Sequence, residues 1–165
     1  MAQERLRDPA FHPPGTYLAE SIEFSVVVPV MNEEGNAADL AREIAAVLDG
    51  RSYEMIFVDD ASRDDTRAEL AALKAEMPAL RVLGHRSNAG QSRAVRSGVL
   101  AARAPVIGTL DGDGQNDPAD LPKLLAKLTR PEAPPNLGMV AGNRLKRRDN
   151  WSKRAASRIA NSIRR

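Results

Sequence analysis

Cysteine is absent from this chain of 165 residues. The absence excludes disulfides, thiolate metal sites and cysteine nucleophiles, and it suits a reducing compartment. Any metal must therefore be bound by oxygen or histidine ligands. Histidine is scarce as well: His12 and His85 are the only two. Neither lies in a nucleophile motif, so a Ser-His-acid hydrolase has no support, and His85 reads as a loop residue rather than a base.

Long apolar runs are also missing. The longest, Phe24 to Met31, is interrupted by Pro29 and falls far short of the ~20 residues that a membrane-spanning helix needs. The first residues mix charges with prolines and lack the apolar centre of a secretory signal. We therefore expect a flexible leader over residues 1–21 and a cytoplasmic protein that does not cross a membrane.

Two common nucleotide-binding motifs do not occur. There is no G-x-x-x-x-G-K-[ST] and no G-x-G-x-x-G, so a nucleotide kinase and a typical dinucleotide oxidoreductase both lose support. Hydrophobic residues make up 42% of the chain, which is enough for one core at this length. The sequence predicts a single domain.

Short β-rich runs alternate with helical patterns along the chain. The expected strands are 25–30, 54–58, 80–83, 105–110 and 138–141, and the expected helices are 36–48, one from about 64, 90–103, 118–128 and 152–163. Asp117 and Pro118 suit the cap and first position of the fourth helix. Nearly continuous apolar strands between helices predict an α/β fold with a mainly parallel sheet and helices on both faces.

Polar residues follow three of the predicted strands, at the edge where such sheets bind ligands. Asn32, Ser62 and Asp117 are explained well as helix caps and turns. The same explanation accounts poorly for Asp111 and Asp113. In an extended segment Asp111, Asp113 and Gln115 would project to one side, and these oxygen ligands favour Mg²⁺ or Mn²⁺ over zinc.

A calcium loop is the competing interpretation of this segment, since D-G-D-G-Q begins like an EF-hand. It fails because the sixth position is Asn116 rather than glycine and the twelfth is Pro122 rather than glutamate. Gly112 and Gly114, between the expected ligands, would let a bulky ligand approach the backbone closely. A nucleotide sugar fits that description.

Five motifs in this order resemble the family-2 glycosyltransferases, and specifically their dolichyl- or polyprenyl-phosphate mannosyltransferase-like branch. They are VVPVMNEEGN, IFVDDASRDDT, RSNAGQSRAVRSG, TLDGDGQNDP and VAGNR. The resemblance runs from about Phe24 to the end of the chain. It implies a GT-A-like, Rossmann-like fold and a metal-dependent enzyme that transfers a hexose from a nucleotide sugar with inversion of configuration.

The resemblance also implies roles for individual residues. Those expected to bind the nucleotide sugar are Pro29, Met31, Glu33, Val58, Asp60, Asp111, Gly112, Asp113 and Arg144. Asp111 and Asp113 are the expected catalytic residues, and with Gln115 they are the expected ligands of Mg²⁺ or Mn²⁺. The family often has tyrosine where this chain has Met31, so a ring contact with the nucleoside is lost here.

The family usually continues into an acceptor-binding segment, whereas this sequence stops at Arg165 inside a helical pattern without a C-cap. We therefore expect residues 22–165 to be a nucleotide-sugar-binding glycosyltransferase domain that is incomplete at its C-terminus. A truncated binding module without turnover stays open as an alternative. GDP-mannose and UDP-hexose users share these motifs, so the donor stays open too.

The resemblance implies a polyprenyl-phosphate acceptor. The second pKa of a phosphate monoester is about 6, so such an acceptor is ionised at neutral pH without a strong base. An enzyme acting on a saccharide hydroxyl would need a positioned carboxylate, and its polymerising relatives carry Q-x-x-R-W, which is absent here. That acceptor remains the second alternative.

The end of the chain is strongly basic. Residues 144–165 hold nine Lys or Arg and one acid, which leaves 15 bases and 21 acids upstream. Trp151, Ala155, Ile159 and Ile163 recur every four residues and form an apolar stripe. We expect weak peripheral contact of 151–165 with an anionic membrane, although packing of the stripe on the sheet is equally compatible. No aromatic platform accompanies the charge, so nucleic acid is not an expected partner.

Overall fold

The structure is a computed structural model, and it describes residues 22–142. Its centre is a four-stranded sheet in the order β3-β2-β1-β4 with every pairing parallel. The strands are β1 (Phe24–Val30), β2 (Tyr53–Asp59), β3 (Leu80–Gly84) and β4 (Val106–Thr109). The predicted α/β fold with a parallel sheet is confirmed. The expected leader, Arg144 and the basic helix within 151–165 lie outside the described residues.

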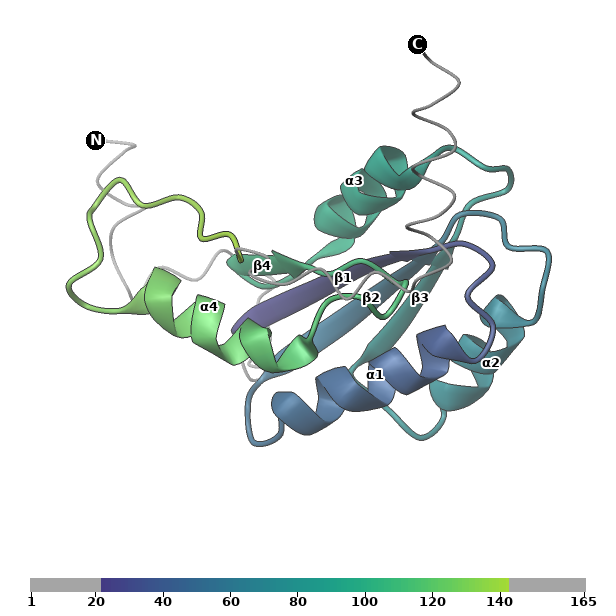
Figure 1. Cartoon of the computed structure of the whole chain (residues 1–165), viewed down its shortest axis with the longest axis horizontal. Helices are drawn as coiled ribbons and strands as arrows, with labels where there is room; N and C mark the ends of the chain where they lie inside the picture. Colours follow the sequence, from purple (N-terminus) through teal and green to yellow (C-terminus); the bar gives the residue numbers. More distant parts are fainter. Residues whose placement is uncertain (1–21, 143–165) are drawn as a thin grey trace, which may run out of the picture.

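Helices cover both faces of the sheet. They are α1 (Asn36–Val47), α2 (Thr66–Leu73), α3 (Gln91–Ala101) and α4 (Leu121–Thr129), the last preceded by a 3₁₀ turn, Pro118–Asp120. Helices α1, α2 and α4 lie on one face, and α3 lies alone on the other (Figure 1). All seven residues of β1 are buried because this strand has neighbours on both sides and helices above and below.

Within residues 22–142 the predicted elements agree with the structure within a few residues, with one exception. Asp117 caps the 3₁₀ turn through Ala119 N at 2.9 Å, as its position predicts. The strand expected at 138–141 is wrong: within the described part of the chain this segment has no regular structure. It offers one β-branched residue, Val140, between two glycines, which gives little tendency to extend and pair.

Helix α3 approaches the sheet very closely. Its buried residues are Ala94 and Gly98, and a Cβ added at Gly98 would lie 2.4 Å from a methyl carbon of Val27. Alanine and glycine at these two positions let the helix axis lie near the strands. Their small size also leaves α3 with little buried apolar area, so hydrophobic contact alone holds it weakly.

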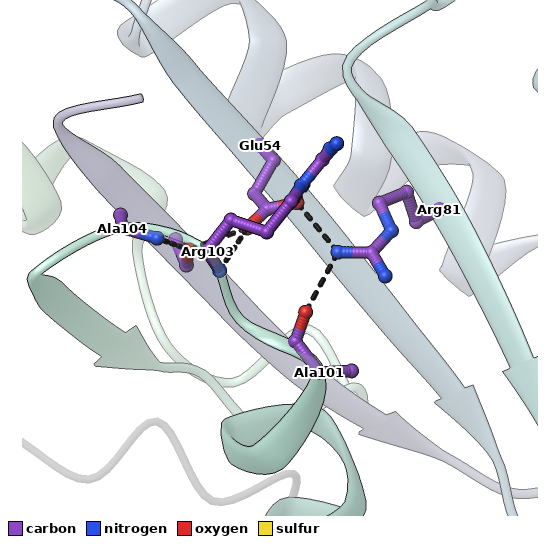
Figure 2. A network of polar contacts seen from close by, with 6 residues as sticks. Glu54, Arg81, Ala101, Arg103 and Ala104 are labelled. Carbon is purple, nitrogen blue, oxygen red and sulfur yellow. Dashed lines mark hydrogen bonds and ion pairs between the residues drawn. The ribbon is translucent and has the colours of Figure 1, made fainter. Parts of the chain in front are cut away.

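A buried carboxylate holds the end of α3 instead. Glu54, at the start of β2 and 1% exposed, accepts hydrogen bonds from Arg81 (2.7 Å) and from the backbone N–H (2.7 Å) and Nε (2.9 Å) of Arg103. Arg81 also donates to the carbonyl of Ala101, the last residue of α3, at 2.8 Å (Figure 2). A cation at a helix C-terminus complements the helix dipole.

The hydroxyl of Ser25 completes this network. It donates to Glu54 Oε1 at 2.8 Å and accepts from the backbone N–H of Ala104 at 3.1 Å. Burial alone would raise the pKa of Glu54, but the hydrogen bonds from Arg81, Arg103 and Ser25 lower it from 4.5 to about 2. The carboxylate therefore joins β1, β2, β3 and the connection after α3 at the amino-terminal edge of the sheet.

We predict that Glu54→Gln lowers the free energy of unfolding at neutral pH by about 2–3 kcal/mol, because the neutral amide leaves two arginines without a counter-charge. The folded-state pKa lies below the ordinary one. The stabilisation is therefore complete above 4.5 and is lost as pH falls through about 2. Urea unfolding of both proteins should show a difference that shrinks in acid.

Glu43→Gln is the matched control, since Glu43 is exposed on α1 and its change should cost less than about 0.5 kcal/mol. Equal losses in the two variants would contradict a structural role for Glu54.

Candidate functional site

A hollow of about 440 Å³ lies at the carboxyl ends of β1, β2 and β4. Its lining residues are Pro29, Val30, Met31, Glu33, Asp60, Asn88, Gly90, Gln91, Ala94, Asp111, Gly112 and Asp113. The strand order reverses between β1 and β4, and ligands of open α/β sheets bind at such a reversal. Because four of its residues are carboxylates, Glu33, Asp60, Asp111 and Asp113, we name it the acidic hollow.

The end of β1 forms one wall of the acidic hollow. Met31 is 40% exposed, and its Sδ accepts a hydrogen bond from Asn88 Nδ2 at 2.9 Å. Glu33 is half-buried, and its backbone N–H donates to Thr66 Oγ1 at 2.8 Å. Met31 and Glu33, both predicted to bind the nucleotide, thus lie beside the strand end as expected.

Side chains from the loop before α2 and its first turns fix the backbone of this wall. The N–H of Asn32 donates to Ser62 Oγ (2.9 Å), that of Glu34 to Asp64 (3.2 Å) and that of Gly35 to Glu69 (2.8 Å). Asn32 has a φ of 55°, a conformation that asparagine tolerates better than most residues. The loop after β1 is therefore held in one shape before any ligand arrives.

Asp60 holds the opposite wall. It is 3% exposed and accepts hydrogen bonds from the backbone N–H groups of Ala89 (2.8 Å) and Gly90 (2.7 Å) and from His85 Nδ1 (2.7 Å). Burial would raise its pKa, but the hydrogen bonds from Ala89, His85 and Gly90 lower it below its ordinary value. Asp60 stays ionised and anchors the loop that leads into α3.

Asp60 does not cap the helix that follows β2. Helix α2 begins at Thr66, and Asp64 is the residue whose Oδ1 accepts from Thr66 N at 3.2 Å and from its Oγ1 at 2.6 Å. Asp60 instead stabilises the start of α3, a long-range contact that sequence spacing does not reveal.

Asp111 and Asp113 both line the acidic hollow, but the chain between them is not extended. Residues 112–114 form a turn, and Asp113 Oδ1 accepts from Gln115 N at 3.1 Å. The prediction of one extended segment is therefore wrong, because an aspartate that bonds the backbone two residues on curls the chain. Asp111 Oδ1 accepts from Gln91 Nε2 at 2.8 Å.

The two glycines of this turn have different roles. A Cβ at Gly112 would lie 2.6 Å from the carbonyl oxygen of Pro29 and 2.6 Å from a methyl carbon of Val30, so glycine is required for packing on the end of β1. Gly114 has a φ of 66° with no atom near its missing Cβ, so there glycine serves the turn. Close approach of a ligand is not needed to explain Gly112.

Three predicted residues are not among those that line the hollow. Val58 is fully buried and packs with Ile56 and Ala94 beneath α3. Gln115 is exposed beyond the turn, and Arg144 lies outside the described residues. Conversely, Asn88 and Gln91 line the hollow without having been singled out. They lie in the motif that follows β3 at the same edge of the sheet, which is the signal that points to them.

The acidic hollow is built to receive positive charge. None of its lining residues is a lysine or arginine, so its four carboxylates repel one another unless a cation offsets them. Within residues 22–142 no cluster of three or more His, Cys, Asp or Glu suits a metal. Two carboxylates, Asp111 and Asp113, remain as ligands. Mg²⁺ commonly takes one or two carboxylates plus waters and phosphate oxygens, so this pair fits such a cation.

The family model of glycosyl transferase family 2 matches residues 25–164. The chain belongs to this family, and its relatives are enzymes of that class. It is 38% identical over 133 residues to dodecaprenyl-phosphate galacturonate synthase of Rhizobium johnstonii, covering 79% of this chain and 38% of the relative. It is 34% identical over 149 residues to undecaprenyl-phosphate 4-deoxy-4-formamido-L-arabinose transferase of Edwardsiella ictaluri, covering 87% and 44%. The matches thus span less than half of either relative's length.

Solved structures agree on the GT-A fold. Glucosyl-3-phosphoglycerate synthase of Mycobacterium tuberculosis, in complex with UDP, matches with a TM-score of 0.55 and 25% identity over 74% of this chain and 47% of the other. The mannosyltransferase PcManGT of Pyrobaculum calidifontis, in complex with GDP-Man and Mn²⁺, matches with a TM-score of 0.52 and 23% identity over 68% and 33%.

We predict that Asp60→Ala lowers the free energy of unfolding by about 2–4 kcal/mol, since it leaves two backbone N–H groups and His85 without their acceptor. Asp64→Ala, the control at the true start of α2, should lose about 1 kcal/mol, as a lost cap does. Chemical unfolding of both variants measures the difference. An Asp60 variant no less stable than the Asp64 variant would remove Asp60 as the anchor of α3.

Proposed function

We propose that this chain is the nucleotide-sugar-binding part of a metal-dependent, inverting glycosyltransferase whose acceptor is a polyprenyl phosphate. The observation that carries the proposal is the acidic hollow, where Asp111 and Asp113 from one strand end face the end of β1. Because no lysine or arginine lines this cluster of carboxylates, it can bind an anionic sugar donor only together with a cation. The family membership supplies the reaction class.

In this proposal the two walls of the hollow bind different parts of the donor. Pro29, Met31, Glu33, Val58 and Asp60 bind the nucleoside, Val58 through its position in β2 because its side chain is buried. Asp111, Gly112 and Asp113 bind the diphosphate, and Arg144 adds a cationic contact to it. The rigid loop after β1 orients the nucleoside at little entropic cost when it binds.

Asp111 and Asp113, with Gln115, hold Mg²⁺ or Mn²⁺ in this proposal. When bound, the cation neutralises the diphosphate and stabilises the charge that develops on the leaving group. Asp113 is exposed, with one oxygen on Gln115 N. Asp111 is oriented by Gln91. Gln91 thus positions one of the two carboxylates from the first turn of α3.

The names of the relatives and the bonding of the described histidine support a polyprenyl-phosphate acceptor. Both named relatives act on a polyprenyl phosphate by their names. A phosphate with a second pKa of about 6 carries its nucleophilic oxygen already ionised. His85, the one histidine in the described range, bonds Asp60 and Ser97 and is not needed as a base. A saccharide hydroxyl would instead require a positioned carboxylate as its base.

Membrane contact is part of the proposal. No helix within residues 22–142 is long and apolar enough to cross a bilayer. A peripheral position on the cytoplasmic face, with the basic residues of 151–165 at the surface, would bring the hollow to a lipid-bound acceptor.

We predict that Asp113→Ala weakens the Mn²⁺-dependent binding of a nucleoside diphosphate by at least about tenfold, because the substitution removes a proposed ligand of the cation. The fold should stay stable, since the Asp113 side chain is exposed. Titration calorimetry with GDP and UDP, with and without Mn²⁺, measures this. Asp117→Ala is the control in the same loop, since it loses only a cap. Unchanged Mn²⁺-dependent affinity in the Asp113 variant would refute the metal site.

A nucleotide-sugar-binding module without turnover is the second candidate, since the part of each relative that this chain matches is less than half of its length. Thermal stabilisation by one nucleotide sugar among GDP and UDP donors identifies the ligand by mass action. Release of the nucleoside diphosphate in the presence of a polyprenyl phosphate then shows turnover. Stabilisation without release would favour the module.

A further inference from the structure

A second hollow, of about 620 Å³, lies beside the loop between β3 and α3. Its polar lining residues are His85, Arg86, Ser87, Arg93, Arg96 and Ser97, and we name it the basic hollow. It shares no lining residue with the acidic hollow. The proposed function makes no use of it.

The three arginines have no partner inside the described part of the chain. None of their guanidinium groups forms a hydrogen bond or an ion pair with residues 22–142. Residues 84–110 contain no Asp or Glu at all. Asp60, the carboxylate bonded to His85 of this hollow, also accepts hydrogen bonds from two backbone N–H groups. The positive charge of the hollow is therefore not neutralised.

The position of two of these arginines is unfavourable for the helix that carries them. Arg93 lies in the first turn of α3 and Arg96 lies three residues later, so two like charges share one face. The helix N-terminus already carries partial positive charge, and its first turn contains no acid to compensate. An anion in the hollow would offset both costs.

Among the neutral side chains that line the hollow, only Ser87 offers a hydrogen-bond donor to an anion. With Nδ1–H of His85 donating to Asp60, its Nε2 accepts from the hydroxyl of Ser97, which joins them at 2.9 Å. Ser87 contributes a hydroxyl that is exposed. Planar guanidinium groups bind phosphate oxygens in pairs, and the hydroxyl of Ser87 can add a single hydrogen bond.

We propose that the basic hollow binds a phosphate group distinct from the diphosphate of the sugar donor, carried either by a soluble phosphorylated molecule or by a lipid headgroup. Three unpaired guanidiniums match a dianionic group better than a single carboxylate. The volume exceeds that of one phosphate, so the hollow has room for a phosphate group carried on a larger molecule. This inference stands whether or not the acidic hollow binds a nucleotide sugar.

The test uses the whole chain and compares two variants that lose the same charge. Arg93→Gln with Arg96→Gln removes two guanidiniums from the hollow. Arg51→Gln with Arg130→Gln removes two exposed ones elsewhere. Titrations with inorganic phosphate and with pyrophosphate, monitored by NMR, should show binding at least about tenfold weaker than in the unmodified chain for the first variant only. Equal weakening in both variants would mean that net charge alone attracts the anion, and would overturn the site.

Vesicles identify the source of the phosphate. Co-sedimentation with phosphatidylcholine vesicles containing phosphatidic acid, lost in the first variant alone, assigns the hollow to a lipid headgroup. Phosphate or pyrophosphate binding without arginine-dependent sedimentation assigns it to a soluble ligand. If the chain binds neither the phosphates nor the phosphatidic acid vesicles, the proposal is overturned. Mn²⁺-dependent UDP and GDP affinity should be equal in the two variants, and a loss confined to the first would place these arginines in the acidic hollow and overturn a separate site.

Discussion

Two buried carboxylates at opposite ends of β2 hold α3 on the sheet, and both hollows depend on that helix. Asp60, just after β2, accepts hydrogen bonds from the backbone N–H groups of Ala89 and Gly90, which precede α3. Glu54, at the start of β2, accepts hydrogen bonds from Arg103, which follows α3. The helix itself buries only Ala94 and Gly98. Polar contacts at its two ends therefore supply what its small apolar face cannot.

The loop before α3 separates opposite charges. On one side lie the carboxylates of the acidic hollow, and on the other lie the arginines of the basic hollow. Asp60 and His85 occupy the boundary and are bonded to each other at 2.7 Å. Asp60 already accepts three hydrogen bonds, one of them from His85, and it forms no ion pair with the three arginines. Each hollow can thus take a ligand of its own charge preference, a cation with a diphosphate on one side and a phosphate group on the other.

Much of the fold and part of the site could be predicted from sequence. The runs 25–30 and 54–58 predict strands covered on both faces, and in a parallel sheet their carboxyl ends lie at one edge. That reasoning placed Pro29, Asp60 and Asp111 together. It could not find the contact of Gln91 with Asp111, or of Glu54 with Arg81 and Arg103, because side-chain pairs between distant elements leave no periodic trace. A charged residue opening a strand reads as exposed, whereas Glu54 is buried.

The docking of α3 also links the two hollows energetically. Gln91 and Gly90 line the acidic hollow, while Arg93 and Arg96 line the basic one, so a single local opening of the helix removes a wall from each. A ligand in either hollow favours the docked helix and thereby improves the other hollow for its own ligand. Linkage requires this effect to be mutual. A phosphate-bearing molecule at the arginines and a nucleotide at the carboxylates would therefore bind with positive cooperativity, transmitted through one helix of 11 residues rather than through any contact between the ligands.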